Sequence, residues 1–137
     1  MNAKKDEYKL NIVNIGNYKG DASTAQQLME DALTSYPDMA VIFTVGAPAC
    51  IGALAAIKGQ GASTKMIGFD ANPEAHEAIL DEVDGQIWVG DDAQDPHQIG
   101  YKNAEEMVKY LTEGTVDEPV ILIAPSLVDA ANAVKPE

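Results

Sequence analysis

Short apolar runs that alternate with helical patterns are the feature that most constrains the fold of this 137-residue chain. Each run has the length of a strand and is followed by turn residues and then by apolar residues at helical spacing. We expect five strands, at residues 11–15, 39–45, 66–69, 86–89 and 119–123. Strands that alternate with helices predict a single α/β domain over residues 1–137, with a doubly wound parallel sheet in the strand order 2-1-3-4-5.

The expected helices carry recognisable start and stop signals. Asn72-Pro73 and Asp95-Pro96 each supply an N-cap residue and a first-turn proline, and Gly114 can end a helix in the left-handed conformation. We expect helices at residues 23–35, 48–59, 73–83 and 96–113, and a short one from residue 126. The second of these is almost entirely apolar, which predicts that it is largely buried.

Right-handed crossovers determine which face of the sheet each helix covers. They place the helices after the second, third and fourth strands on one face and leave the helix at 23–35 on the other. That second face needs further cover, because exposed apolar sheet promotes aggregation. We expect the segment at 126–134 to dock there as a helix, or a second copy of the chain to cover it as a homodimer.

Charge and composition exclude several classes of function. Nine basic residues against 22 acidic ones give a net charge of −13, which repels nucleic acid and anionic membranes. The single cysteine, Cys50, cannot form an internal disulfide and lies in an apolar run, which predicts a buried, inert thiol. The chain shows no signal peptide and no apolar run of membrane-spanning length.

Motifs of catalysis and cofactor binding are absent from the sequence. It has no nucleophile elbow, HExxH, P-loop or strand-following GxGxxG, so we predict a non-enzyme without catalytic residues or a cofactor. His76 and His97 have no partner at ligand spacing, and Asp91, Asp92 and Asp95 lack the order of a calcium loop. We therefore predict no metal site and interpret these three acids as a solvated loop.

Candidate binding residues come from the loops that follow the strands, because an open parallel sheet binds its ligands at the carboxyl ends of its strands. Asp70 follows an apolar strand directly, and its alternative role is to cap the next helix. Gln94 offers a donor and an acceptor to a polyhydroxy ligand, although an exposed loop glutamine needs no function. The candidate ligand-binding residues are Asp70, Gln94, Asn72, Gly46 and Asp21. Trp88 could stack on a sugar, but we favour a place in the core.

Four segments in a fixed order resemble one known family. They are residues 36–43, 51–54, 67–70 and 93–101. Together they resemble the C-terminal lobe of type I periplasmic sugar-binding proteins, the ribose- and galactose-type receptors of ABC importers. The resemblance implies that Asp70 and Gln94 bind sugar hydroxyls, that an N-terminal lobe and an ABC transporter permease are partners, and that the full-length protein is periplasmic or extracellular.

The sequence departs from the family pattern at two contacts. Gly46-Ala47 stands where the family usually has an Asn-Asp pair, and Ala22 stands where an arginine is frequent. The resemblance also extends to the effector-binding lobes of LacI-type transcriptional regulators, which is the alternative function. A phospho-receiver domain likewise has an Asp after its third strand, but it needs an acidic pair after the first strand, where this chain has Gly16-Asn17.

Overall fold

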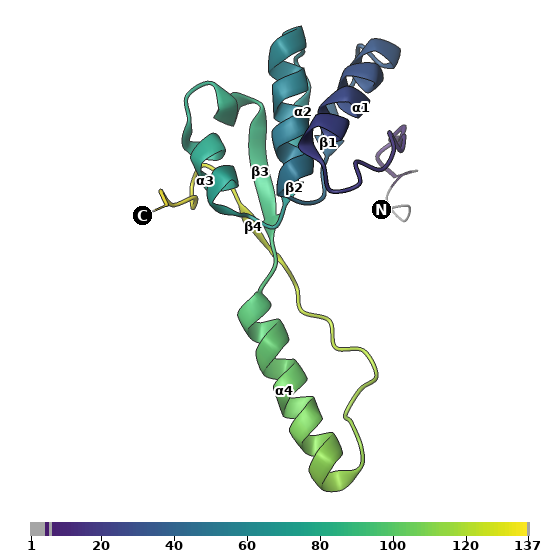
Figure 1. Cartoon of the computed structure of the whole chain (residues 1–137), viewed down its shortest axis with the longest axis vertical. Coiled ribbons are helices and arrows are strands. Elements are labelled where there is room, and N and C mark those ends of the chain that lie inside the picture. Colours follow the sequence, from purple (N-terminus) through teal and green to yellow (C-terminus); the bar gives the residue numbers. More distant parts are fainter. Residues whose placement is uncertain (1–4, 6, 137) are drawn as a thin grey trace.

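The computed structural model describes residue 5 and residues 7–136, and it shows a body of helices and strands from which α4 (Pro96–Glu113) projects together with the irregular segment that follows it (Figure 1). In chain order the elements are α1 (Ala22–Ser35), β1 (Val41–Phe43), α2 (Ala47–Gln60), β2 (Lys65–Phe69), α3 (Pro73–Leu80), the 3-10 turn η2 (Asp84–Gln86), β3 (Trp88–Ala93), α4 (Pro96–Glu113) and β4 (Ser126–Val128). None of the helices in the described part is both long and apolar enough to cross a membrane.

The sheet has four strands in the order β1-β2-β3-β4. The first three strands are parallel, and β4 runs antiparallel to β3. The α/β class is therefore confirmed, but the sheet is mixed and the five-strand parallel order 2-1-3-4-5 is not found in the described residues. The strands that were expected on either side of residues 11–15 pair directly with each other as β1 and β2.

The segment at 11–15 was predicted to be a strand, but it has no regular secondary structure and is exposed except for Ile15, which packs against the core. Its two asparagines, Asn11 and Asn14, do not suit a central strand, which is buried on both faces. The Asn14 side chain accepts a hydrogen bond from Gly16 N at 2.9 Å, and Asn17 accepts one from Lys19 N at 2.8 Å. Such local bonds favour a turn over strand pairing.

The C-terminal part also differs from the prediction. Residues 119–123 form no strand, and the segment from Ser126, predicted to be helical, begins with the strand β4. The helix is prevented by a turn, because Asp129 accepts a hydrogen bond from Ala131 N and Asn132 Nδ2 donates one back to Leu127 O. Beyond the turn, Val134 N donates to His76 Nδ1 of α3, so this segment lies beside α3.

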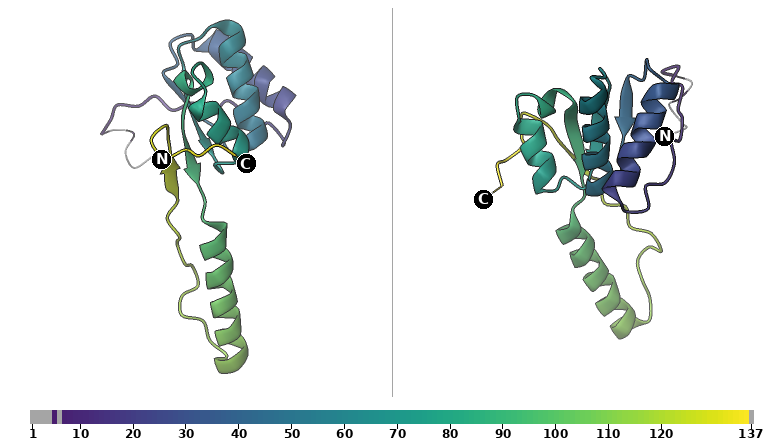
Figure 2. Two further views of the ribbon diagram at one scale, coloured as in Figure 1. Left: turned by 90° about the vertical axis from the view of Figure 1, so that its left-hand side faces the viewer. Right: turned by 45° about the horizontal axis from the view of Figure 1, so that its top comes forward.

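All of the packed core lies on one face of the sheet. Ile42, Met66 and Trp88 are the strand residues of one buried cluster, and Met29 and Leu33 of α1 belong to the same cluster. The prediction that α1 covers the opposite face is therefore wrong. With no strand beyond β1, α1 packs against α2, where Gly52 lets the two backbones approach closely. In Figure 2 (left) the helices of the body lie on one side and the strands on the other.

Several helix boundaries follow the sequence signals. Asn72 Oδ1 accepts from Ala75 N at 3.0 Å, Asp95 Oδ1 accepts from Gln98 N at 2.9 Å, and Gly114 adopts φ 70°. Six residues of α2 are buried, as its apolar composition predicts, and the helix ends at Gln60, next to the predicted end near Gly59, with Gly61 as its cap. Val83 was expected on the buried side of α3, but it follows the helix and is 62% exposed.

Candidate functional site

Two predicted binding residues meet at the carboxyl ends of β2 and β3. Asp70 follows β2 and Gln94 follows β3, and parallel pairing of these strands brings their ends together. Gln94 Nε2 donates a hydrogen bond to Asp70 Oδ1 at 2.6 Å. Both side chains are exposed, so the pair presents a carboxylate and an amide to solvent at this edge of the sheet.

Gly46 lies next to the same carboxylate. Its φ of 88° requires glycine, and a Cβ at this position would lie 2.8 Å from the Tyr18 hydroxyl and 3.8 Å from Asp70 Oδ2. The absence of a side chain therefore leaves room for a phenol and a carboxylate at one place. Tyr18 was not among the predicted residues, although it is the aromatic residue of a loop that was expected at this edge.

The backbone at the end of β2 is strained. Asp70 has φ 105° and Ala71 has φ 44°, which are unfavourable for residues with a side chain. Asp70 N donates to Asp92 O at 3.0 Å, and Ala71 N donates to the Asp91 side chain at 2.7 Å. The two bonds to β3 hold the Asp70 carboxylate in its exposed position.

The buried side chain of Asp91 holds this loop in place by accepting the hydrogen bond from Ala71 N. It was interpreted as part of a solvated acidic loop, but it lies on β3 and is only 1% exposed. Its second carboxylate oxygen accepts a hydrogen bond from Trp88 Nε1 at 3.0 Å, so the indole is a core residue, as predicted, that also orients the acid. Burial raises the pKa of Asp91, which its hydrogen bonds to Ala71 N and Trp88 counteract in part.

Asn72 and Asp21, the other two predicted binding residues, act as helix caps. Asn72 Oδ1 caps α3. One oxygen of Asp21 accepts hydrogen bonds from Thr24 N and from the hydroxyls of Ser23 and Thr24, all at 2.7 to 2.8 Å. The Ser23 hydroxyl and the Thr24 backbone and hydroxyl groups lower the pKa of Asp21 to about 2. Binding roles for these two residues stay predictions.

The pKa of Asp21 has a testable consequence for stability. Because the folded pKa is about 2, below the ordinary value of 3.8, the carboxylate contributes stability above pH 3.8 that is lost as the pH falls through 2. We expect Asp21→Asn to be less stable than the parent chain at neutral pH and equal to it below pH 2. Urea unfolding of both proteins between pH 2 and 7 measures this difference, and a difference that stays constant would contradict the role of the charge.

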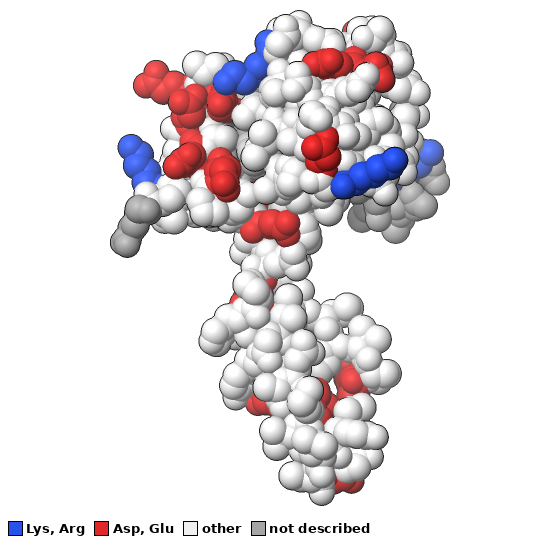
Figure 3. Space-filling model, viewed as in Figure 1, with Lys and Arg blue, Asp and Glu red and all other residues white. Residues whose placement is uncertain are grey.

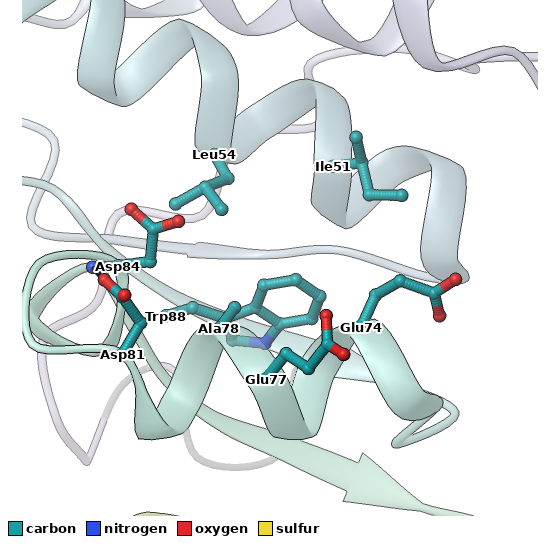
Figure 4. A pocket seen from close by; sticks show the side chains of 8 residues that line it. All are labelled: Ile51, Leu54, Glu74, Glu77, Ala78, Asp81, Asp84 and Trp88. Atoms are coloured by element: carbon teal, nitrogen blue, oxygen red, sulfur yellow. Dashed lines mark hydrogen bonds between the residues drawn. The ribbon is translucent and has the colours of Figure 1, made fainter. Parts of the chain in front are cut away.

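A separate hollow lies on the helical face, between α2 and α3 (Figure 4). It has a volume of about 310 Å³, with Trp88 at its base and four carboxylates around it, those of Glu74, Glu77, Asp81 and Asp84. Asp84 pairs with Lys58, and Asp81 accepts hydrogen bonds from two backbone N–H groups of the following turn. Figure 3 shows acidic side chains gathered over this part of the body. Two of the four carboxylates, those of Asp81 and Asp84, already have partners within the chain, and the predicted binding residues lie elsewhere, so we place the candidate site at Asp70 and Gln94.

The described residues include neither a cluster of metal-ligating side chains nor an accessible thiol. They contain no group of three or more His, Cys, Asp or Glu side chains that could hold a metal ion. Cys50 is fully buried, contacts the Thr44 hydroxyl at 3.0 Å, and has a pKa raised by its burial. A buried, protonated thiol is not a nucleophile.

The edge as a whole can form hydrogen bonds with a neutral polar molecule. Asp70 accepts, Gln94 accepts and donates, and the Tyr18 hydroxyl does both. These groups surround no closed cavity, so they can contact only one side of a ligand. Tight binding normally requires that most of a ligand's surface be enclosed. Such an open arrangement can therefore supply no more than one wall of a binding site.

Sequence comparison connects this chain with a protein family. Residues 1–116 match the family described as periplasmic binding protein domain. The ribose import binding protein RbsB of Escherichia coli (strain K12) is 31% identical over 105 residues, which is 76% of this chain and 34% of that protein. This chain therefore spans about a third of the length of the curated relatives it matches.

Solved structures show the same fold. An ABC transporter solute binding protein from Agrobacterium vitis bound with alpha-D-tagatopyranose superimposes with a TM-score of 0.78 at 20% identity, over 98% of this chain and 45% of that one. A second solute binding protein from Agrobacterium vitis, with bound D-fucose, gives a TM-score of 0.72 at 28% identity, over 93% of this chain and 43% of that one. The likeness covers nearly the whole chain but less than half of either structure.

Proposed function

This chain belongs to the family of periplasmic binding protein domains, and from that premise we propose that it is a sugar-binding lobe of an ABC importer receptor, without catalytic activity. The observation that carries the proposal is the hydrogen bond of 2.6 Å between Gln94 and Asp70 at the carboxyl ends of two parallel strands. This pair offers the acceptors and donors that sugar hydroxyls need, beside a glycine whose missing side chain leaves room for the Tyr18 hydroxyl.

The mode of action follows from the open geometry. A sugar would contact Asp70, Gln94 and Tyr18 beside Gly46 on this lobe, with Asn72 and Asp21 as further contacts, and a second lobe would close over its other side. The proposed partners are that N-terminal lobe and the permease of an ABC transporter, and the proposed location of the full protein is the periplasm or the extracellular space. The relatives' names describe import proteins, which favours transport over the effector lobe of a transcriptional regulator.

Binding by this chain alone should be weak, because one wall encloses little of a ligand. We expect a dissociation constant for D-ribose of roughly 1 mM or weaker, and we expect Asp70→Ala to abolish the binding that is present. Isothermal titration calorimetry measures both. The control is Asp92→Ala, which removes a neighbouring carboxylate that has no side-chain hydrogen bond in the described structure.

Two outcomes would count against the proposal. Micromolar binding of D-ribose to the chain alone would contradict the need for a second lobe. Equal effects of Asp70→Ala and Asp92→Ala on weak binding would contradict the assignment of the site to Asp70.

A further inference from the structure

Asp91 is a buried acid that is not itself among the proposed sugar contacts. It is 1% exposed and lies on β3, where it pairs with Gly68 of β2. Its two carboxylate oxygens accept hydrogen bonds from Ala71 N at 2.7 Å and from Trp88 Nε1 at 3.0 Å. Both partners are donors, and an ionised carboxylate is the side-chain group that offers two acceptor oxygens and no donor. The two contacts therefore suit an acid at this position and no other side chain of its size.

The neighbouring strand leaves room for this carboxylate. A Cβ at Gly68 would collide with Asp91 Oδ2 and would lie 2.9 Å from Cys50 Sγ, so no larger residue fits while the acid stays in place. Gly68 does not have a positive φ, so its backbone conformation does not require glycine. A glycine inside a strand normally weakens the strand. The missing side chain is therefore explained by the space that the Asp91 carboxylate occupies.

The charge of Asp91 is held at a cost in stability. Burial raises the pKa of this carboxyl, and the nearby charges of Asp70 and Asp92 add to the rise, while the hydrogen bonds from Ala71 N and Trp88 act against it. A raised pKa means that folding disfavours the ionised form. Groups that are kept in an unfavourable state are frequent at functional sites. The acid is therefore better explained by the loop that it holds than by core packing.

Two hydrogen bonds to β3 hold both of the peptide groups that flank the Asp70 Cα. The peptide group before it is held by Asp70 N, which donates to Asp92 O at 3.0 Å. The peptide group after it is held by Ala71 N, which donates to the Asp91 side chain. Because each peptide group is planar, these two bonds determine φ and ψ of Asp70 and hence the direction of its side chain. The first bond uses a backbone oxygen that any residue at position 92 would supply, whereas the second depends on the side chain at position 91.

We propose that Asp91 is a positioning residue of the binding site, which acts through Ala71 N to hold Asp70 in the orientation that binds a ligand hydroxyl. The proposal rests on the proposed function, in which Asp70 contacts a sugar. In the observed orientation one Asp70 oxygen accepts from Gln94 and the other lies on the side of Gly46. The φ angles of 105° at Asp70 and 44° at Ala71 are unfavourable, so the loop leaves this conformation when the bond to Asp91 is lost.

Hydrogen exchange in the absence of ligand tests whether Asp91 holds the loop. Asp91→Asn keeps the size of the side chain but turns an NH₂ group toward one of the two donors. The control is Ile57→Val, which removes one buried methyl group from α2. Relative to the slowest core amides, we expect exchange at Ala71 N–H to become about tenfold faster or more in Asp91→Asn and to change less than about twofold in Ile57→Val. Equal exchange ratios in the two variants would overturn the proposal.

Trp88 is the single tryptophan of the chain, so its indole N–H gives one resolved signal that reports on Asp91. We expect this signal to shift together with the amides of Asp70 and Gln94 when the parent chain is titrated with D-ribose. Trp88 is 1% exposed and cannot contact the sugar, so such a shift must pass through Asp91. An indole signal that stays unchanged while those amides shift would overturn the proposal.

The affinity of the same titration completes the test. Asp91→Asn should raise the dissociation constant for D-ribose about tenfold or more, whereas Asp92→Asn, on the same strand, should change it less than about twofold. Equal affinities of these two variants would overturn the proposal. If no amide of the parent chain responds to D-ribose, the proposed function fails for this sugar, and the exchange at Ala71 N–H still decides whether Asp91 holds the loop.

Discussion

Replacing Gly52 by alanine should destabilise the chain by about 3 kcal/mol, because it inserts a methyl group between two helix backbones. A Cβ at Gly52 of α2 would lie 2.7 Å from Gln26 N and 2.8 Å from the Ala25 Cβ of α1, and closer still to Ala22 O. These atoms belong to backbone or to a buried methyl group, so they cannot move aside as a flexible side chain would. The helices must separate, and the Met29 and Leu33 contacts with the core are weakened.

The control lies in the same helix. Gly59 has open space around the position of its Cβ, so Gly59→Ala should stabilise the chain by about 0.5 kcal/mol through better helix propensity. Urea unfolding monitored by circular dichroism measures both variants. Equal stability of the two would mean that α1 does not pack closely on α2.

Asp91→Ala should cost about 3 kcal/mol, because it leaves two donors without an acceptor. Ala71 N donates to the Asp91 side chain at 2.7 Å and Trp88 Nε1 donates to it at 3.0 Å, and the side chain is buried. Without these bonds the positive φ angles of Asp70 and Ala71 lose support. Chemical unfolding measures the loss, and Asp92→Ala on the same strand is the control, for which we expect a change of less than about 0.5 kcal/mol.

The pH dependence of Asp91 should have the opposite sign from that of Asp21. Burial raises the folded pKa of Asp91 above 3.8, so the folded state binds this proton more tightly than the unfolded state. The contribution of the group is then fully present below pH 3.8 and declines as the pH rises through the folded pKa. We expect the stability of the parent chain relative to Asp91→Asn to fall over that range, and a rise over the same range would contradict the assignment.

The elements with strong local signals could be predicted from the sequence. α3 and α4 begin at a proline after a cap residue, α2 has Pro48 as its second residue, and Gly114 caps the end of α4 as expected. Apolar runs likewise indicated β1 and β2, whereas the run at 86–89 reached only the first two residues of β3. Local propensity and spacing decide these features, so they need no information from the rest of the chain.

The pairing of strands could not be predicted in the same way. Residues 11–15 carry three β-branched residues that are typical of strands, but they also carry two asparagines, and β1 pairs with β2 without them. Alternation with helices predicted parallel pairing throughout. Instead, after α4 and the segment 114–125 the chain returns to the body, and β4 pairs with the open edge of β3 in the antiparallel direction. The face of the sheet that a helix covers depends on how the strands before and after it pair. The predicted face for α1 was wrong because the strand expected at residues 11–15 does not form.

Part of the candidate site could be predicted from the sequence, because two of its residues lie directly after predicted strands. Asp70 and Gln94 follow adjacent parallel strands, and topology alone brings them together. The role of Asp91 in holding the Asp70 loop could not be predicted. Its burial depends on a bulge between β2 and β3 that shifts the strand register near Met66 and Ile67. Tyr18 was missed because nothing in its own loop indicates that it lies beside Gly46.

The central claim is that the edge formed by Asp70 and Gln94 is the sugar-binding wall, and chemical-shift mapping tests it most directly. The ¹⁵N-labelled chain is titrated with D-ribose to tens of millimolar, in parallel with Asp70→Ala. We predict shifts for the amides of Gly46, Asp70, Ala71 and Gln94 that saturate in the parent chain and are absent from the variant. Shifts confined to the hollow at Leu54 and Trp88, or shifts at the Asp70 edge that persist unchanged in Asp70→Ala, would contradict the account.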